Sequence, residues 1–181
     1  MSRSSQTETA VLGALSVMPM TGYAVREAIR DVLGHFWSES FGQIYPTLAR
    51  LEGEGLVARE VAAPGAAYRL TDAGLVRLRA LLGTPVQPTT PRNGLLLRLF
   101  FGRHLGADAC RTLVEDARAD AVAQLARYAA IRAEIAGEAG TEADHPFWFL
   151  TVAAGEHAAR ATVAWADESL AALAAAPEPA R

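Results

Sequence analysis

The chain has 181 residues, with 17 basic and 20 acidic side chains and a formal net charge of −3. Hydrophobic residues make up 51% and charged residues 20%, a composition that excludes a fully disordered chain. The single cysteine, Cys110, excludes an intramolecular disulfide framework and a cysteine-rich zinc site. The mild acidity argues weakly against a nucleic-acid-binding protein, because such proteins are more often basic.

A proline- and threonine-rich segment divides the sequence into two halves. Residues 84–92 hold three prolines, and a helix cannot continue through them. We therefore expect a first domain over residues 1–83, an extended linker over 84–92 and an α-helical domain over 93–176.

The first half predicts three helices, a β-hairpin and a fourth helix. Apolar residues recur at the spacing of helices, and two β-rich runs flank a Pro-Gly turn. Thr21 and Thr71 supply side chains that can cap the second and fourth helices. Three helices followed by a hairpin form the winged helix-turn-helix layout, in a mainly α fold class. The expected ranges, in chain order, are 8–17, 22–33, 43–54, 56–61, 66–71 and 72–82.

The third predicted helix carries a polar row beside its apolar row. Gln43, Thr47 and Arg50 share one face and offer an amide, a hydroxyl and a guanidinium, which can bond to base edges or phosphates. An ordinary solvated helix face has the same pattern, so both interpretations stay open. The apolar row, expected to face the core, is Ile44, Leu48 and Leu51.

Two tyrosines lie close to this predicted helix pair. Tyr23 stands near the start of the second helix, where helix amides and a phenol can together hold a phosphate. Tyr45 can bond to a phosphate through its hydroxyl. Partly buried core aromatics are the alternative interpretation for both.

The second half predicts helices whose apolar surface exceeds what one chain can cover. A short apolar helix over 93–104 precedes a long helix over 108–136 with heptad spacing and a last helix over 145–175 that is apolar nearly all round. We expect a second copy of the chain to cover this surface, because twofold dimers are the commonest assemblies. The expected dimer residues are Val114, Ala117, Ala121, Tyr128, Ile131, Ala154, Ala158 and Trp165.

The last predicted helix also carries candidates for a ligand pocket. Phe147, Trp148, Phe149 and Trp165 would suit a flat aromatic ligand at a bundle or subunit interface. Ordinary core packing explains the same residues without a ligand, so this alternative stays open.

Short motifs follow one another in a fixed order over residues 9–82. They are Leu12–Leu15, Thr21–Tyr23, Phe36–Ser38, Ile44–Glu52, Glu54–Val57 and Tyr68–Gly74. Their order and spacing resemble the PadR family of transcriptional regulators, and Leu95–Phe101 with the two following helices resembles the longer subfamily. The resemblance implies a dimeric winged-helix repressor that binds a double-stranded DNA operator. It also implies that the C-terminal helices form the dimer and that a small aromatic or drug-like molecule can release the DNA.

The wing departs from the family pattern. The family's wing commonly carries glycine followed by basic residues, whereas residues 63–67 here are uncharged and only Arg59 and Arg69 flank them. We therefore expect recognition to depend on the third helix plus these two arginines. The expected DNA-binding residues are Tyr23, Ser40, Gln43, Tyr45, Thr47, Arg50, Arg59 and Arg69.

The acidic residues are distributed unevenly along the chain, which weakens the argument from net charge against DNA binding. Residues 1–82 carry eight arginines and eight acidic residues, whereas residues 83–181 carry nine arginines and twelve acidic residues. The acid excess therefore belongs to the half that is expected to form the dimer.

Features of enzymes, metal sites and membrane proteins are missing from the sequence. The four histidines lack metal-ligand spacing, and no catalytic constellation, phosphate-binding loop or dinucleotide-binding pattern is present. Cys110 is expected to pack rather than react. No apolar run reaches ~18 residues and no signal peptide opens the chain, so we expect a cytoplasmic protein without cofactor, metal or membrane partner. The alternative to a DNA-binding regulator is a sensor or adaptor whose winged helix binds a protein.

Overall fold

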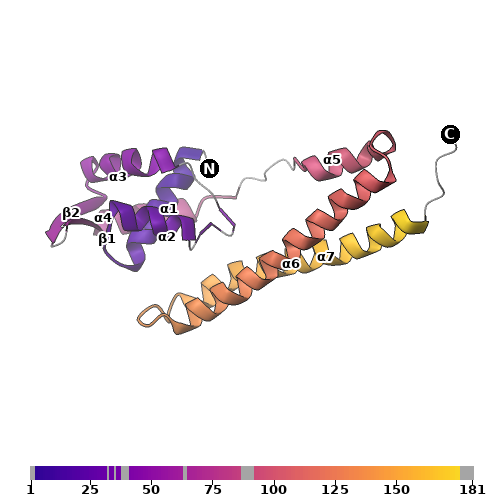
Figure 1. The fold of residues 1–181 in the computed structure, drawn as a ribbon. Helices are drawn as coiled ribbons and strands as arrows, with labels where there is room; N and C mark the ends of the chain where they lie inside the picture. Colours follow the sequence, from indigo (N-terminus) through magenta and orange to yellow (C-terminus); the bar gives the residue numbers. More distant parts are fainter. Residues whose placement is uncertain are drawn as a thin grey trace. The chain divides into compact units, whose positions relative to one another are not determined.

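The proline- and threonine-rich segment separates two units in the computed structural model of the chain (Figure 1). The units are Met1–Thr89 and Thr90–Arg181, and each has its own hydrophobic core. The structure describes residues 3–31, 33–34, 36–37, 41–62, 65–86 and 92–175. Ser40 and part of the predicted linker lie outside the described residues, so the linker bounds stay a prediction.

The N-terminal unit has the winged helix-turn-helix layout that its sequence predicts. Its elements, in chain order, are α1 (Arg3–Val17), β1 (Met20–Thr21), α2 (Gly22–Asp31), the 3-10 turn η1 (Phe41–Gln43), α3 (Ile44–Gly53), β2 (Val57–Ala62), β3 (Gly65–Leu70) and α4 (Asp72–Leu82). The strands pair antiparallel in the order β1–β3–β2, and the β2–β3 hairpin is the wing. Strand β1 is absent from the sequence prediction, because two residues are too few to show an alternating pattern.

The core of the N-terminal unit draws apolar side chains from all four helices and the wing. The apolar row predicted on the third helix is buried in this core, so α3 has a fixed inner side. The buried core residues are Val11, Leu12, Leu15, Val25, Ile29, Ile44, Leu48, Leu51, Val57, Leu78 and Leu81.

Helix α1 begins more than one turn before its predicted start. The prediction placed the first residue at Glu8, whereas the helix begins at Arg3. The buried residues where the added turn meets the predicted start are polar, because Thr7 and Glu8 are only 2% and 4% exposed. An apolar pattern cannot reveal a turn that buries polar groups.

Both predicted threonine caps are present. The Thr21 hydroxyl accepts a hydrogen bond from the Ala24 amide at 3.1 Å, and the Thr71 hydroxyl accepts one from the Gly74 amide at 3.0 Å. Each bond satisfies an amide in the first turn that has no partner within its own helix. The starts of α2 and α4 are therefore determined by local side-chain chemistry.

Helix α3 has well-defined ends. Because η1 leads into the helix, Pro46 falls in the first turn, where a missing amide costs little. At the other end Gly55 has a φ of +71°, and the Leu56 amide donates to the Leu51 carbonyl at 2.9 Å. The left-handed glycine turns the chain directly from α3 into β2.

The C-terminal unit contains α5 (Gly94–Phe100), the 3-10 turn η2 (Gly102–His104), α6 (Ala107–Gly137) and α7 (His145–Ala175). The two long helices agree closely with the predicted ranges. The predicted helix over 93–104 is wrong in its second part, because the α-helix ends at Phe100. Gly102 lies against α6, and a Cβ added there would stand 2.7 Å from the Cys110 sulfur. A glycine is needed for this close approach.

Helices α6 and α7 run antiparallel, side by side (Figure 1). Two ion pairs join them, one between Arg118 and Asp167 at 2.6 Å and one between Arg132 and Glu156 at 3.2 Å. Buried residues recur at every seventh position of both helices, the spacing of a coiled coil. They are Val114, Ala121, Tyr128 and Ile135 on α6 and Val152, Ala159 and Ala166 on α7. None of the described helices is both long and apolar enough to span a bilayer.

A close contact between α6 and α7 depends on a glycine. A Cβ at Gly155 would lie 2.3 Å from Cζ of Tyr128, and Tyr128 is itself buried. The tyrosine ring therefore fills the space that any other residue at position 155 would need.

We predict that Gly155→Ala destabilises the C-terminal unit by about 1–3 kcal/mol, because the added methyl overpacks the helix pair. Thermal unfolding followed by circular dichroism measures the effect. Gly137→Ala is the matched control, since a Cβ there meets nothing within 4 Å. Equal melting temperatures for the Gly155→Ala and Gly137→Ala chains would contradict the packing described.

Candidate nucleic-acid interface

The outer side of α3 is exposed, opposite the buried row of the same helix. Gln43 is exposed at the entry to the helix, and Thr47 is half-buried one turn later. The exposed ridge beside them consists of Pro46, Ala49 and Gly53, which lack long side chains. The backbone of α3 can therefore come close to another surface. The sequence analysis does not identify this ridge, because its residues carry no polar side chains that would indicate a contact with DNA.

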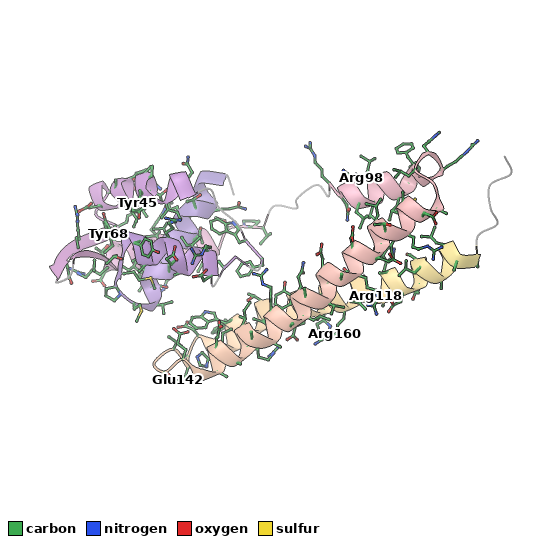
Figure 2. All side chains as sticks on the ribbon, in the orientation of Figure 1. Tyr45, Tyr68, Arg98, Arg118, Glu142 and Arg160 are labelled. Carbon is green, nitrogen blue, oxygen red and sulfur yellow. The ribbon has the colours of Figure 1, made fainter. Side chains whose placement is uncertain are left out.

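The two tyrosines considered as phosphate contacts are exposed and not core aromatics. Tyr23 is 61% and Tyr45 is 50% exposed. A Cβ at Gly22 would lie 2.9 Å from the Tyr45 ring, so the start of α2 lies directly against α3. Figure 2 marks Tyr45 on α3. The Arg26 guanidinium lies 5.9 Å from the centre of the Tyr23 ring. The structure thus brings Tyr45 close to the end of α2 that carries Tyr23.

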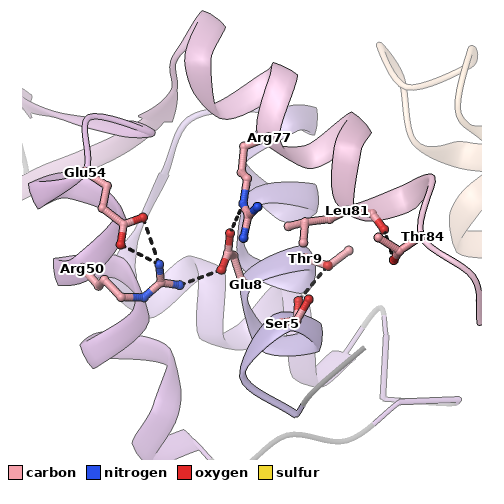
Figure 3. Close-up of polar contacts among 8 residues, drawn as sticks. All are labelled: Ser5, Glu8, Thr9, Arg50, Glu54, Arg77, Leu81 and Thr84. Atoms are coloured by element: carbon pink, nitrogen blue, oxygen red, sulfur yellow. Dashed lines mark hydrogen bonds and ion pairs between the residues drawn. The ribbon is translucent and has the colours of Figure 1, made fainter. Parts of the chain in front are cut away.

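A buried carboxylate connects α3 to α1 and α4 (Figure 3). Arg50 of α3 donates from Nη2 to Oε2 of Glu8 at 2.9 Å, and Arg77 of α4 donates from Nε to Oε1 of Glu8 at 2.6 Å. The other guanidinium nitrogen of Arg50, Nη1, donates to both carboxylate oxygens of Glu54 at 2.9 Å. Two positive and two negative groups therefore form one neutral network.

The ionisation of Glu8 depends on its two arginine partners. Burial alone would raise the pKa of this carboxyl group. Hydrogen bonds from Arg77 and then Arg50, with the attraction of their charges, outweigh burial and hold the pKa of Glu8 below its ordinary value of 4.5. The carboxylate is therefore charged at neutral pH although its side chain is only 6% exposed.

This network changes the interpretation of Arg50. The sequence predicts a base contact, but the guanidinium is held by Glu8 and Glu54. The sequence contains a signal that the prediction overlooked, because Glu8 shares the helical spacing of Leu12 and Leu15, which face the core. A charged residue in a core row requires partners.

The two wing arginines lie on opposite faces of the hairpin. Arg59 pairs across the sheet with Tyr68, and Arg69, next to Tyr68, pairs with Ala58. Because neighbouring residues of a strand point to opposite faces, one surface cannot receive both side chains. Arg69 donates to Glu60, whereas no ion pair of the described residues includes Arg59. The Arg59 guanidinium lies 6.0 Å from the Tyr68 ring centre.

The four aromatic candidates for a ligand pocket do not meet in a single chain. Trp148 and Phe149 pack against the core of the C-terminal unit, and Phe147 is 66% exposed. Trp165 lies on the same helix about 25 Å away, at 1.5 Å rise per residue. His145 and Arg132 contact the Phe149 ring, at 6.1 and 5.2 Å from its centre.

The predicted dimer residues fall into two groups. Val114, Ala121 and Tyr128 are already buried in a single chain, so they offer no surface to a partner. Ala117, Ile131 and Trp165 are half-buried, and Ala154 and Ala158 are exposed. The heptad pattern that suggested a dimer therefore serves packing between α6 and α7, and a dimer would use other faces of these helices.

Family models match both halves of the chain. Residues 11–80 match the model described as transcriptional regulator PadR-like family. Residues 91–174 match the model described as virulence activator alpha C-term. The two matches correspond to the two units of the fold.

Three relatives illustrate the similarity of the whole chain to known proteins. The chain is 31% identical over 114 residues to the negative transcriptional regulator PadR of Bacillus subtilis, covering 59% of this chain and 62% of that protein. The match thus spans less than two thirds of that relative. In structure, the PadR-like regulator BC1756 from Bacillus cereus has a TM-score of 0.79 at 27% identity, covering 93% of this chain and 98% of that chain. The Vibrio cholerae virulence activator AphA has a TM-score of 0.73 at 26% identity, with 93% and 98% covered.

Two solved structures of the Bacillus subtilis protein contain ligands. One is a complex with operator DNA, with a TM-score of 0.79, 25% identity and coverage of 92% of this chain and 98% of that chain. The other is a complex with p-coumaric acid, with a TM-score of 0.76, 25% identity and the same coverage.

The fold and the exposed face of α3 define a winged helix-turn-helix protein with an appended pair of long helices. Residues 11–80 carry the domain of the PadR-like transcriptional regulators, and the C-terminal region matches the longer subfamily, so the chain is homologous to the PadR regulators. Its homologues are regulators and not enzymes.

We predict that the Glu8 network makes stability pH-dependent. Because folding lowers the pKa of Glu8, its carboxylate stabilises the fold above about pH 4.5, and this contribution is lost as the pH falls through the lower folded-state pKa. Glu8→Gln should reduce the free energy of unfolding at neutral pH by about 1–3 kcal/mol and flatten the acid side of the profile. Denaturant unfolding between about pH 3 and 7 measures both effects.

Glu54→Gln is the matched control, because Glu54 binds the same arginine but is 46% exposed. Its effect should stay below about 1 kcal/mol, as for surface ion pairs. A Glu8→Gln chain with the stability profile of the unmodified chain would rule out the network as a stabilising element.

Proposed function

We propose that the chain is a cytoplasmic PadR-like repressor that binds an inverted-repeat DNA operator as a dimer. The observation that carries the proposal is the exposed outer side of α3, on a helix whose inner side is anchored in the core. The second helix of a helix-turn-helix pair usually enters the major groove. Gln43 and Thr47 offer an amide and a hydroxyl that can bond to base edges. The complex of the Bacillus subtilis relative with operator DNA supports this interpretation.

Other residues of the N-terminal unit would hold the DNA backbone. Exposed Tyr23 and Tyr45 suit phosphate contacts beside the start of α2, and Arg59 suits one from the wing. Arg69 would contribute less, because Glu60 already neutralises it. Ser40, outside the described residues, remains part of the proposed contact set.

We propose that the C-terminal unit forms the dimer. Much of its apolar surface is exposed in a single chain, and exposed patches of this kind mark interaction sites. Twofold symmetry would present two α3 helices to half-sites about 34 Å apart or a multiple of that distance. The large exposed apolar residues of the described part of this unit are Leu96, Leu97, Phe100, Phe101 and Leu105 near α5, Val122 on α6, and Phe147 and Leu150 on α7.

A small aromatic ligand would regulate the repressor. Trp148 and Phe149 provide flat apolar surfaces, with Arg132 close to the Phe149 ring as a positive group. The relative in complex with p-coumaric acid supports this ligand class. Trp165 would not take part in the same site of one chain, given its distance along α7.

A protein-binding adaptor is the second candidate function. Acidic residues neutralise two arginines predicted to bind DNA, Arg50 and Arg69. This arrangement would suit a winged helix whose partner is a protein and not a polyanion. The adaptor predicts an intact dimer without salt-sensitive DNA binding.

We predict specific binding to the chain's own upstream DNA, measured by fluorescence anisotropy at several salt concentrations. Gln43→Ala should weaken operator binding about tenfold, the loss of one good base contact, and leave the salt slope unchanged. Arg59→Ala should lower the salt slope by about 0.9, the value for one phosphate contact. Arg69→Ala is its matched control, with a smaller change because Arg69 is ion-paired.

The absence of salt-sensitive binding by a chain that is dimeric in sedimentation would contradict the repressor and favour the adaptor. Equal slope changes for Arg59→Ala and Arg69→Ala would contradict the assignment of the wing contacts.

We predict that p-coumaric acid, as a probe of the aromatic site, changes tryptophan fluorescence and weakens operator binding. Trp148→Phe should abolish the fluorescence change. Trp165→Phe should preserve it, because Trp165 lies about 25 Å from Trp148 along α7. A response that depends on Trp165 and not on Trp148 would place the ligand elsewhere and overturn the site.

A further inference from the structure

The Glu8 carboxylate occupies an unusual position for an acidic residue in a protein that binds DNA. It lies 4% exposed in α1, on the row of that helix that also buries Leu12 and Leu15. Its two oxygens each accept a hydrogen bond from a different helix, one from Arg50 of α3 and one from Arg77 of α4. One carboxylate thus joins three helices (Figure 3).

Stability alone does not account for this arrangement. Replacing a buried ion pair with well-packed apolar residues is often neutral or stabilising, so such pairs are weak evidence for stability. A bidentate carboxylate, by contrast, constrains direction, because both acceptor oxygens are fixed relative to each other. Apolar contacts let a helix slide or rotate by small amounts, whereas this geometry holds Arg50, and with it α3, at one position.

The position of Arg50 along α3 matters for the outer face of that helix. Arg50 lies on the same helical row as Gln43 and Thr47. The network therefore holds α3 through the row that carries the proposed base contacts. The second carboxylate, Glu54, holds the other guanidinium nitrogen one turn further on and keeps the Arg50 side chain extended toward Glu8. A rotation of α3 would break the bond between Arg50 and Glu8, whereas the Arg50–Glu54 pair lies on one helix and would move with it.

We propose that Glu8 is a positioning residue for DNA recognition, which orients α3 through Arg50 while Arg77 orients Glu8. The inference rests on the proposed function, since it assigns a task to the helix expected to read the operator. It gives Arg50 an indirect role in place of the base contact that its sequence position indicates. The chain's acidic Glu8 would therefore increase affinity for a polyanion, although its own charge opposes binding.

A positioning role for Glu8 predicts that Glu8→Gln lowers operator affinity, whereas the loss of a negative charge alone would raise it. Glu8→Gln removes one negative charge and nearly preserves the shape of the side chain. If charge alone mattered, the variant would bind every DNA more tightly, because phosphate attraction would rise. If Glu8 positions α3, operator binding weakens about tenfold while binding to unrelated DNA stays equal or strengthens.

The experiment compares Glu8→Gln, Arg77→Ala and Arg79→Ala in the full chain, below the melting temperature of every variant. Arg77 and Arg79 both lie on α4 with the same charge, but only Arg77 binds Glu8. Anisotropy titrations give dissociation constants for operator and unrelated DNA. Glu8→Gln and Arg77→Ala should each reduce the ratio of specific to non-specific affinity about tenfold, whereas Arg79→Ala should leave it within about twofold.

Hydrogen exchange without DNA provides a second readout. Amides of α3 should exchange faster in Glu8→Gln than in the unmodified chain, while those of α2, which supplies no residue to the network, should keep their rates. If the chain binds no operator but α3 still responds in this way, the proposed function fails and the positioning role stands. Tighter operator binding by Glu8→Gln, or unchanged exchange in α3, would overturn the positioning role.

Discussion

The buried carboxylate of Glu8, held between two guanidinium groups, is the interaction on which the arrangement of the N-terminal unit depends. It connects three helices at one point, and the outer face of α3 takes its direction from that connection. Apolar burial of Leu48 and Leu51 determines which side of α3 faces the core, but it permits small rotations of the helix. The hydrogen bonds of the Glu8 network are directional, so they restrain the rotation of α3 more closely than apolar contacts do.

Under the proposed function, neutralised arginines would favour selective over non-specific binding of DNA by a chain of net charge −3. Acidic partners hold Arg50, Arg69 and Arg77, so little of the arginine charge in the N-terminal unit is available for phosphate attraction. Affinity would then depend on the fit of α3 and a few phosphate contacts more than on the overall field. Such a protein should bind unrelated DNA weakly, which favours discrimination between sites.

Local chemistry that a sequence displays could be predicted, whereas contacts between distant residues could not. Thr21 and Thr71 cap their helices as expected, because capping depends only on residues three positions apart. The range of α7 follows from its apolar residues. The Glu8 network joins residues far apart in the chain, so no local pattern contains it. The heptad spacing of α6 predicts a packing seam but does not identify the partner helix, and within one chain Val114, Ala121 and Tyr128 are buried where α6 packs on α7.

The ionisation of Glu8 is the most direct test of whether Arg50 and Arg77 hold its carboxylate. Carboxyl ¹³C NMR of the full chain, titrated with acid, gives the pKa of this one group. We predict a midpoint below the ordinary value of 4.5, because two guanidinium groups outweigh the effect of burial. The midpoint should rise in Arg77→Ala and remain unchanged in Arg79→Ala. A midpoint above 4.5 in the unmodified chain would show that burial dominates and that the arginines do not hold the carboxylate as described.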